Sequence, residues 1–162
     1  MSKIIALCAM LFVCCLTSLL AQVPTQPAAP LPKVFVMGEY EQAYETLTNL
    51  YPRTLLEICN SDMRQAFEKW LEVAKALEAH AENVKFDIRG VKVRMHIFWE
   101  KDGSITHIGY IMRPESRNIS KEHLSAFLSS FTRVYRLPIN AEQPFSHYTI
   151  ASFPIFSEPS DH

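Results

Sequence analysis

Two histidines, His96 and His107, are of the residue type that holds metal ions, and both lie in one stretch of alternating apolar and polar residues. If Asp102-Gly103 is a two-residue hairpin turn, the alternation makes the two imidazoles diagonal neighbours on one face of a β-hairpin. A zinc site needs three or four ligands in all, and the sequence places no further ligand beside them. We therefore predict ordinary exposed sheet histidines and expect neither a metal site nor a cofactor.

Hydroxyl and imidazole groups, which together can form a nucleophile and its base, occur close in sequence at two places. These are Ser146-His147 and the segment from Ser120 to His123. Neither has the glycine-flanked turn between a strand and a helix that exposes a catalytic serine. The 4 glycines of the chain are too scattered to form a phosphate-binding loop. We predict no catalytic residue and expect a protein that is not an enzyme.

Three cations, Lys92, Arg94 and Arg113, share the hairpin face of the two histidines and could contact an anionic partner. Exposed strands are also commonly charged to prevent pairing with other strands, so we interpret this face as solvated. Over the whole chain, 16 basic residues stand against 17 acidic ones. This balance argues against a nucleic-acid partner, because binding to nucleic acid requires a strongly basic surface.

The segment from Arg89 to Arg113 carries the clearest structural signal, since its residues alternate on both sides of the proposed turn. One predicted face is mostly apolar and pairs Trp99 with Thr106, Ile97 with Ile108, Met95 with Tyr110 and Val93 with Met112. The other face pairs Lys92 with Arg113, Arg94 with Ile111, His96 with Gly109 and Phe98 with His107. We expect the first face to lie against the core.

Residues 1–21 have the form of a secretory signal peptide. Lys3 is positive, the run from Ile4 to Leu20 is apolar, and cleavage is predicted after Ala21. Retention of this run as a membrane anchor is the alternative, since its length is near the lower limit for crossing a bilayer. Residues 22–33 follow as a proline-rich spacer. Cleavage would leave Cys59 as the remaining cysteine, and we predict that it is buried.

Helical spacing of apolar residues predicts helices over residues 39–50, 62–82 and 120–135, with Asp62 and Ser120 at the starts of the second and third. The expected buried stripe of the second helix is Met63, Phe67, Trp70, Leu71, Ala74, Leu77 and Ala81. The segment from Arg53 to Cys59 fits either a short buried strand or the entry to the next helix, and we favour a strand or a loop. A final strand is expected from His147 to Phe156.

These elements predict an α+β domain over residues 34–156, followed by a polar tail at 157–162. In this fold a small antiparallel sheet, made of the hairpin and the C-terminal strand, packs against two or three helices. Each helix can bury its apolar stripe against the apolar face of the hairpin.

Four segments resemble the C-terminal domain of TonB-type energy transducers, in its divergent Bacteroidetes form. They are Ile88 to Val91, Phe98 to Ile105 around the turn, the helix from Leu124 to Phe131, and the aromatic end from Tyr148 to Phe156. The resemblance covers residues 63–156. It implies a small sheet backed by helices that acts in the periplasm and binds a short peptide of an outer-membrane receptor by strand addition.

The resemblance also implies that the last strand is the edge that meets the partner. The peptide-binding residues would be His147, Tyr148, Ile150, Ser152 and Phe153. We therefore expect a periplasmic or secreted, non-enzymatic protein-interaction module of the cell envelope, with no membrane span after cleavage. Two alternatives stay open: a membrane-anchored, truncated transducer that retains Ile4 to Leu20, and a small ligand-binding or hydrolytic protein that uses His96 and His107.

Overall fold

A computed structural model describes residues 30–155 and places the predicted hairpin at the centre of a sheet. The predicted signal peptide, residues 22–29 of the spacer, Phe156 and the tail at 157–162 lie outside the described residues. In chain order the elements are β1 (Val34–Val36), α2 (Glu41–Leu50), β2 (Arg53–Thr54), α3 (Leu55–Ile58), α4 (Met63–Asn83), β3 (Lys92–Trp99), β4 (Ile105–Met112), α5 (Lys121–Val134) and β5 (Phe145–Ser152).

The hairpin of β3 and β4 has the predicted register along most of its length. Every predicted pair between Val93–Met112 and Phe98–His107 is confirmed. The prediction was wrong beside the turn, where Trp99 lies opposite Ile105 and Thr106 is an extra residue in β4. The alternation of side chains therefore determined the faces correctly, and the error is confined to one bulge.

The turn itself holds three residues where two were predicted. The N–H of Glu100 donates to the carbonyl of Ser104 at 2.9 Å, and the N–H of Gly103 donates to the carbonyl of Glu100 at 2.9 Å. Gly103 has a φ of 78°, the left-handed conformation that typically closes a three-residue hairpin loop. A Cβ at this position would lie 2.0 Å from the carbonyl oxygen of Leu137. Both the turn and its contact with the following chain therefore require glycine.

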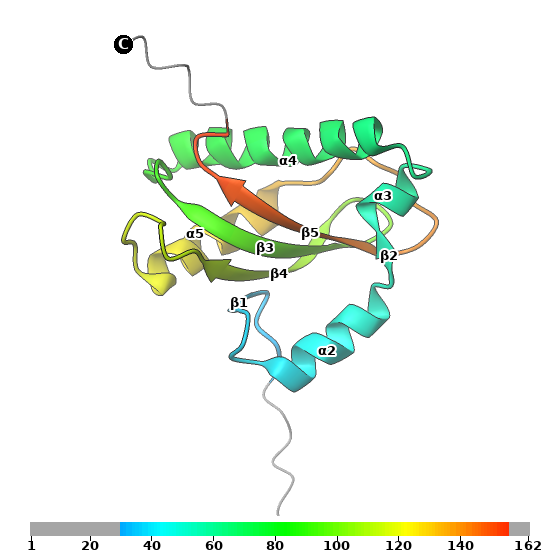
Figure 1. The fold of residues 1–162 in the computed structure, drawn as a ribbon, viewed down its shortest axis with the longest axis horizontal. Helices are drawn as coiled ribbons and strands as arrows, with labels where there is room; N and C mark the ends of the chain where they lie inside the picture. The colour runs from blue at the N-terminus through cyan, green and yellow to red at the C-terminus, as the bar shows by residue number, and fades with distance from the viewer. Residues whose placement is uncertain (1–29, 156–162) are drawn as a thin grey trace, which may run out of the picture.

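Five strands form one mixed sheet in the order β1-β4-β3-β5-β2 (Figure 1). The three central strands, β4, β3 and β5, are antiparallel to one another, as predicted for the hairpin and the C-terminal strand. Two short strands lie outside them, and each is parallel to its neighbour: β1 pairs with β4, and β2 pairs with β5. The predicted α+β class is confirmed, with β1 as an addition that the sequence did not indicate.

The strand or loop favoured for the segment from Arg53 to Cys59 is confirmed only at its first two residues, which are exposed, and most of the segment is a helix. Strand β2 ends at Thr54, and helix α3 begins at the next residue. Thr54 and Glu57 form a capping box, in which each side chain accepts a hydrogen bond from the backbone N–H of the other residue. The box stabilises a helix that is too short to form alone. Cys59 follows the helix and is buried, as predicted.

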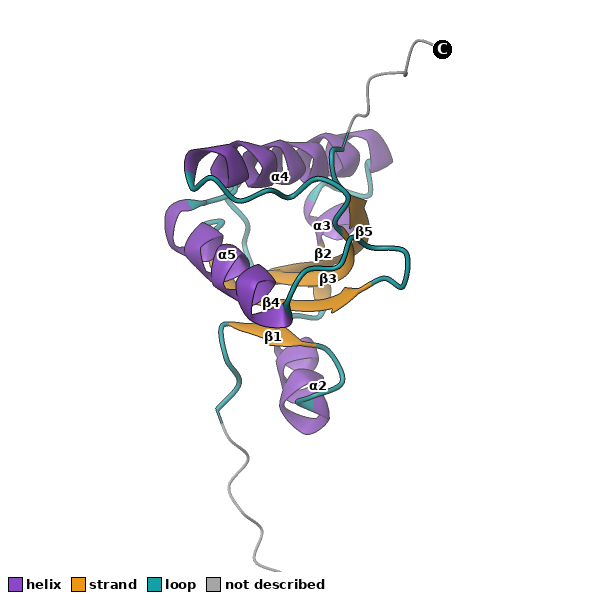
Figure 2. Ribbon diagram, turned by 90° about the vertical axis from the view of Figure 1, so that its left-hand side faces the viewer, coloured by secondary structure: helices purple, strands orange, loops and turns teal. Residues whose placement is uncertain are grey.

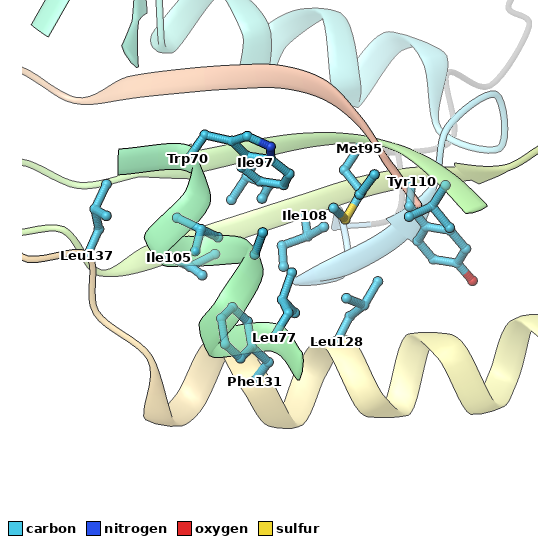
Figure 3. Close-up of a cluster of buried hydrophobic side chains, with 14 of the residues drawn as sticks. Trp70, Leu77, Met95, Ile97, Ile105, Ile108, Tyr110, Leu128, Phe131 and Leu137 are labelled. Carbon is cyan, nitrogen blue, oxygen red and sulfur yellow. The ribbon is translucent and has the colours of Figure 1, made fainter. Parts of the chain in front are cut away.

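Helices α4 and α5 cover the apolar face of the sheet and close the main core (Figure 2). Asp62 caps α4 and Ser120 caps α5, as predicted, because each side chain accepts backbone N–H groups of the first turn. Figure 3 shows part of this core, with Leu77 from α4, Leu128 and Phe131 from α5, and Met95, Ile97, Ile105 and Ile108 from the sheet. Full burial of each large apolar side chain contributes about 1.5–3 kcal/mol.

The buried face of α4 differs from the predicted stripe at its beginning. Met63 is 68% exposed and Phe67 is 58% exposed, whereas Ala66 and Val73 are buried. Helix α3 packs against α4, and the side that α4 turns inward near its start carries the small side chain of Ala66. The prediction followed the largest apolar residues, but close packing of two helices there favours a small one.

Helix α2 crosses the opposite face of the sheet, away from α4 and α5 (Figure 2). It connects β1 at one margin of the sheet to β2 at the other. Leu47 of α2 and the following Tyr51 form a second, smaller core with Phe35, Met37 and Phe98. The face that the sequence analysis interpreted as solvated is therefore partly covered.

Candidate functional site

Strand β5 lies beside the margin of the sheet, and β2 covers only its beginning. On one side β3 pairs with β5 from Phe145 to Ser152. On the other side β2 pairs only with Phe145 and Ser146. Within residues 30–155, no strand pairs with the outer side of β5 from His147 onward. The C-terminal strand is thus second from the margin instead of outermost, but most of its outer edge is open.

The ends of this strand also differ from the prediction. β5 begins at Phe145 and ends at Ser152, whereas the sequence analysis expected residues 147–156. Phe153, just after the end of β5, forms two backbone hydrogen bonds with the segment before β3. Its N–H donates to the carbonyl of Val91 at 2.9 Å, and its carbonyl accepts from the N–H of Gly90 at 2.8 Å. These two bonds show which backbone groups of β5 face β3.

Peptide groups of an antiparallel strand point alternately to its two sides. Because the groups of Phe153 face the side of β3, those of Thr149 and Ala151 face β3 as well. The residues between them direct their N–H and carbonyl groups away from β3. Beyond the part that β2 covers, these outward-facing residues are Tyr148, Ile150 and Ser152, which form the open edge of the sheet.

The five residues predicted to bind a peptide lie in different surroundings. Tyr148 and Ile150 lie on the face of the sheet opposite the main core and are 53% and 49% exposed, and Ser152 is also exposed. His147 faces the core side, with its ring centroid 5.4 Å from that of Trp70, and burial lowers its pKa. Phe153 is buried in the main core. The structure therefore places three of the five at the open edge and turns His147 and Phe153 inward.

His96 and His107 lie on neighbouring strands and on the same face of the sheet, as the register predicted. This is the face opposite the main core, which we call the second face. The prediction that both are exposed is wrong for His96, because α2 covers it and the Tyr44 hydroxyl lies 2.8 Å from its Nδ1. Burial, together with the nearby His147, lowers the pKa of His96 to about 4. His107 is half-buried, and burial lowers its pKa as well. In the described part of the chain, no three His, Cys, Asp or Glu side chains are grouped to hold a metal ion.

A hollow of about 430 Å³ lies where the end of α2, β2 and β5 meet. Its lining includes Thr48, Tyr51, Thr54, His96 and Tyr148. The rings of Tyr148 and His96 meet edge to face, with centroids 5.5 Å apart at 85°. Since Tyr148 also belongs to the open edge, the hollow can receive a side chain from a molecule that lies along that edge.

Helix α2 does not reach the part of the second face around Arg94, where no other part of residues 30–155 covers the sheet. Arg94 of β3 is flanked in one cross-strand row by Ile111 of β4 and Ile150 of β5. Here the predicted solvation holds, since the side chain of Arg94 is exposed. We call this region the open face; it consists of Lys92, Arg94, Ile111, Arg113, Tyr148 and Ile150.

The two hydroxyl–imidazole pairs that stood out in the sequence form no reactive pair. Ser146 and His147 are consecutive in β5, so their side chains lie on opposite faces, and the Ser146 hydroxyl donates to the carbonyl of Tyr51 at 3.4 Å. The Ser120 hydroxyl accepts the backbone N–H of His123 as a helix cap. Both serines therefore have structural roles.

Sequence reasoning missed another serine–histidine contact, which joins the two helices over the main core. Nε2 of His80 in α4 lies 2.7 Å from Oγ of Ser130 in α5. The Ser130 hydroxyl donates to the carbonyl of Phe127 at 2.7 Å, so the histidine must supply the hydrogen of the bond between them. Such a bond ties α4 to α5 and does not activate the serine. No local pattern could reveal it, because the two residues are 50 positions apart.

Comparison of the chain with protein-family models, curated proteins and solved structures finds no match. No helix in the described range 30–155 combines the length and the apolar composition needed to cross a membrane. The geometry of the open edge and the open face is therefore the basis for a functional proposal.

Proposed function

We propose that this protein is a non-enzymatic interaction module of the cell envelope that binds an extended peptide or protein segment by adding it as a strand to β5. The observation that carries the proposal is the open edge, where the backbone groups of Tyr148, Ile150 and Ser152 face outward and no strand of residues 30–155 lies beside them. Unpaired N–H and carbonyl groups in a row are a template for an incoming strand. The resemblance of the sequence to TonB C-terminal domains supports the same mode of binding.

The shape of the edge also favours one added strand of limited length. At one end β2 pairs with Ser146, so a partner cannot pair further back along β5. At the other end the backbone N–H of Ile155 donates to a carboxylate oxygen of Glu78 at 2.6 Å, which holds the chain after β5 against α4. A short peptide segment fits between these limits better than a long strand from another folded sheet.

We propose that the protein is periplasmic or secreted, because residues 1–21 have the form of a secretory signal peptide. The partner would then be a protein of the cell envelope, with an outer-membrane receptor as one candidate. Measuring the mass of the exported protein separates this from an anchored, truncated transducer. Loss of the first 21 residues supports export with cleavage, whereas an intact N-terminus supports the anchor.

The decisive experiment is selection of a displayed library of random ten-residue peptides against the exported protein, repeated with Ile150→Pro. Proline removes the outward N–H of residue 150 and leaves the bonds between β5 and β3 in place, since proline is tolerated in an edge strand where its nitrogen faces solvent. Ile150→Ala is the matched control, because it shortens the side chain and keeps the N–H. We expect selected peptides to bind the wild type and Ile150→Ala, and to bind Ile150→Pro at least about tenfold more weakly.

Ser152→Pro provides a second test of the same kind, in case Ile150→Pro lowers stability. Thermal unfolding and the circular dichroism spectrum show whether each variant remains folded. Selection of no peptide, or peptides that bind the folded proline variants as tightly as the wild type, would count against strand addition.

A further inference from the structure

The open face places cations directly beside the open edge. Arg94 lies one strand in from the edge, opposite Ile150 in β5. Lys92 follows on the same face, opposite Ser152. Arg113, which directly follows β4, lies opposite Lys92 on the same face, since its N–H donates to the Lys92 carbonyl at 2.9 Å. A strand that pairs with β5 would therefore pass alongside a group of positive charges.

Two of these three cations, Lys92 and Arg94, have no acidic partner in the described part of the chain. Arg113 pairs with Glu115 at 2.5 Å. Lys92 and Arg113 are like charges placed directly opposite each other on adjacent strands, an arrangement that destabilises a sheet. An anion bound at this face would relieve that repulsion.

Apolar side chains surround the cations. Ile111, Tyr148 and Ile150 are large apolar residues with exposed side chains, and all three lie on this face. Tyr148 is additionally held by its edge contact with the ring of His96. A partner that covers them gains apolar burial, so the face suits side chains of both kinds, acidic and apolar.

Strand geometry determines which positions of the partner carry the acidic and apolar side chains that meet the open face. Residues of an added strand opposite Tyr148, Ile150 and Ser152 would point to the open face, and the residues between them would point to the opposite face of the sheet. Arg94 is two strand spacings, roughly 10 Å, from the backbone of such a partner. An extended arginine and an extended glutamate can together span that distance across Ile150.

We propose that the open face selects extended peptides in which every second residue points to that face and these residues include both acidic and apolar ones. The carboxylates would meet Arg94 and Lys92 while the peptide pairs with β5. This inference rests on the proposed strand addition at β5. It adds the chemical class of the partner, an acidic and partly apolar peptide.

The peptides selected from the random library provide the first test. We expect Asp and Glu to be enriched at alternate positions, and a peptide in which each Glu is replaced by Gln to bind about tenfold more weakly. Binding of the acidic peptide should also weaken as salt is added, because exposed charge pairs are screened.

Variants of the protein test the same contact from the other side. Arg94→Gln combined with Lys92→Gln should lower the affinity for the acidic peptide about tenfold and leave the affinity for the Gln peptide unchanged. Lys101→Gln is the control for a change in net charge, since Lys101 is an exposed cation in the hairpin turn at the far end of β3. It should leave both affinities unchanged.

The outcomes separate the two proposals. Peptides that bind the wild type, lose affinity for Ile150→Pro and show no preference for acidic residues would overturn the acidic selectivity and leave strand addition intact. The acidic selectivity would also be overturned if the double variant Arg94→Gln, Lys92→Gln bound the acidic peptide as tightly as the wild type does. If the library yields no peptide at all, both proposals fail.

Discussion

The hydroxyl of Tyr44 lies 2.8 Å from Nδ1 of His96, and this bond joins α2 to the middle strand of the sheet. The two rings also meet edge to face, with centroids 5.8 Å apart at 85°. Tyr44 thereby positions α2 over one half of the second face and leaves the half around Arg94 open. This contact lies at the boundary between the covered and the open half of the sheet, and the second core around Leu47 and Phe98 holds α2 on the covered half.

Tyr44→Phe should lower the free energy of unfolding by about 1 kcal/mol, because it removes the hydrogen bond to His96 and keeps the ring contacts. Tyr40→Phe is the matched control: the Tyr40 ring contacts Phe35, and its hydroxyl forms no hydrogen bond within the described residues. We expect a change within about 0.5 kcal/mol for the control. Urea unfolding measures both, and equal losses in the two variants would contradict the role of the bond.

Acidification should destabilise the protein through His96. Burial lowers its pKa to about 4 from an ordinary value of 6.5. Between these values the unfolded chain binds a proton that the folded protein does not, so the free energy of unfolding falls as the pH falls through this range. The complete loss is on the order of 3 kcal/mol. His96→Gln should reduce the difference between urea unfolding at about pH 7.5 and about pH 5; an unchanged difference would show that other groups cause it.

Amide hydrogen exchange along β5 should alternate from residue to residue. The N–H groups of Thr149 and Ala151 face β3 and should exchange slowly, whereas those of Tyr148 and Ile150 face outward and should exchange quickly. Nuclear magnetic resonance of the free protein resolves these amides individually. Uniform protection across the strand would mean that its outer edge is already covered. Added peptide should slow the two outward amides selectively.

Gly109→Ala should destabilise the sheet, although alanine usually suits a strand better than glycine. A Cβ on Gly109 would lie 2.8 Å from the tip of the Phe35 ring and 3.1 Å from Cγ of Met37. We expect a loss of about 1–3 kcal/mol from this overpacking. Combining it with Phe35→Leu, which shortens the ring side chain, should cost less than the sum of the two single changes. Additive losses would show that the ring is not the obstacle.

Local patterns predicted much of the fold. The hairpin register from Val93 to Phe98 was correct, because side chains on a strand alternate and one slip would exchange the two faces. The caps Asp62 and Ser120 were correct, because a helix start needs a side chain to accept its free N–H groups. The length of the hairpin turn was predicted wrongly, because turns of two and three residues both suit such a sequence. The structure has three residues in the turn, with Gly103 in the left-handed conformation and close to Leu137.

The candidate site was predicted only in part. Tyr148, Ile150 and Ser152 were chosen correctly as members of a strand with an open edge, but Phe153 is buried and His147 faces α4. Nothing in the local sequence shows that β2 pairs with the first residues of β5. That pairing decides how much of the edge is open.

The sequence by itself determined which residues share a face of the hairpin and where the long helices begin, because these depend on neighbours within a few positions. Only the tertiary structure decided that Arg94 stays open while His96 is covered, although both lie on one face of the same strand. His96 is covered because α2 packs on the sheet through contacts between distant residues, such as Tyr44 and His96, which are 52 positions apart. Such contacts leave no periodic signal in the chain. The tertiary structure also decided the extent of the open edge, because β2 pairs only with the first residues of β5.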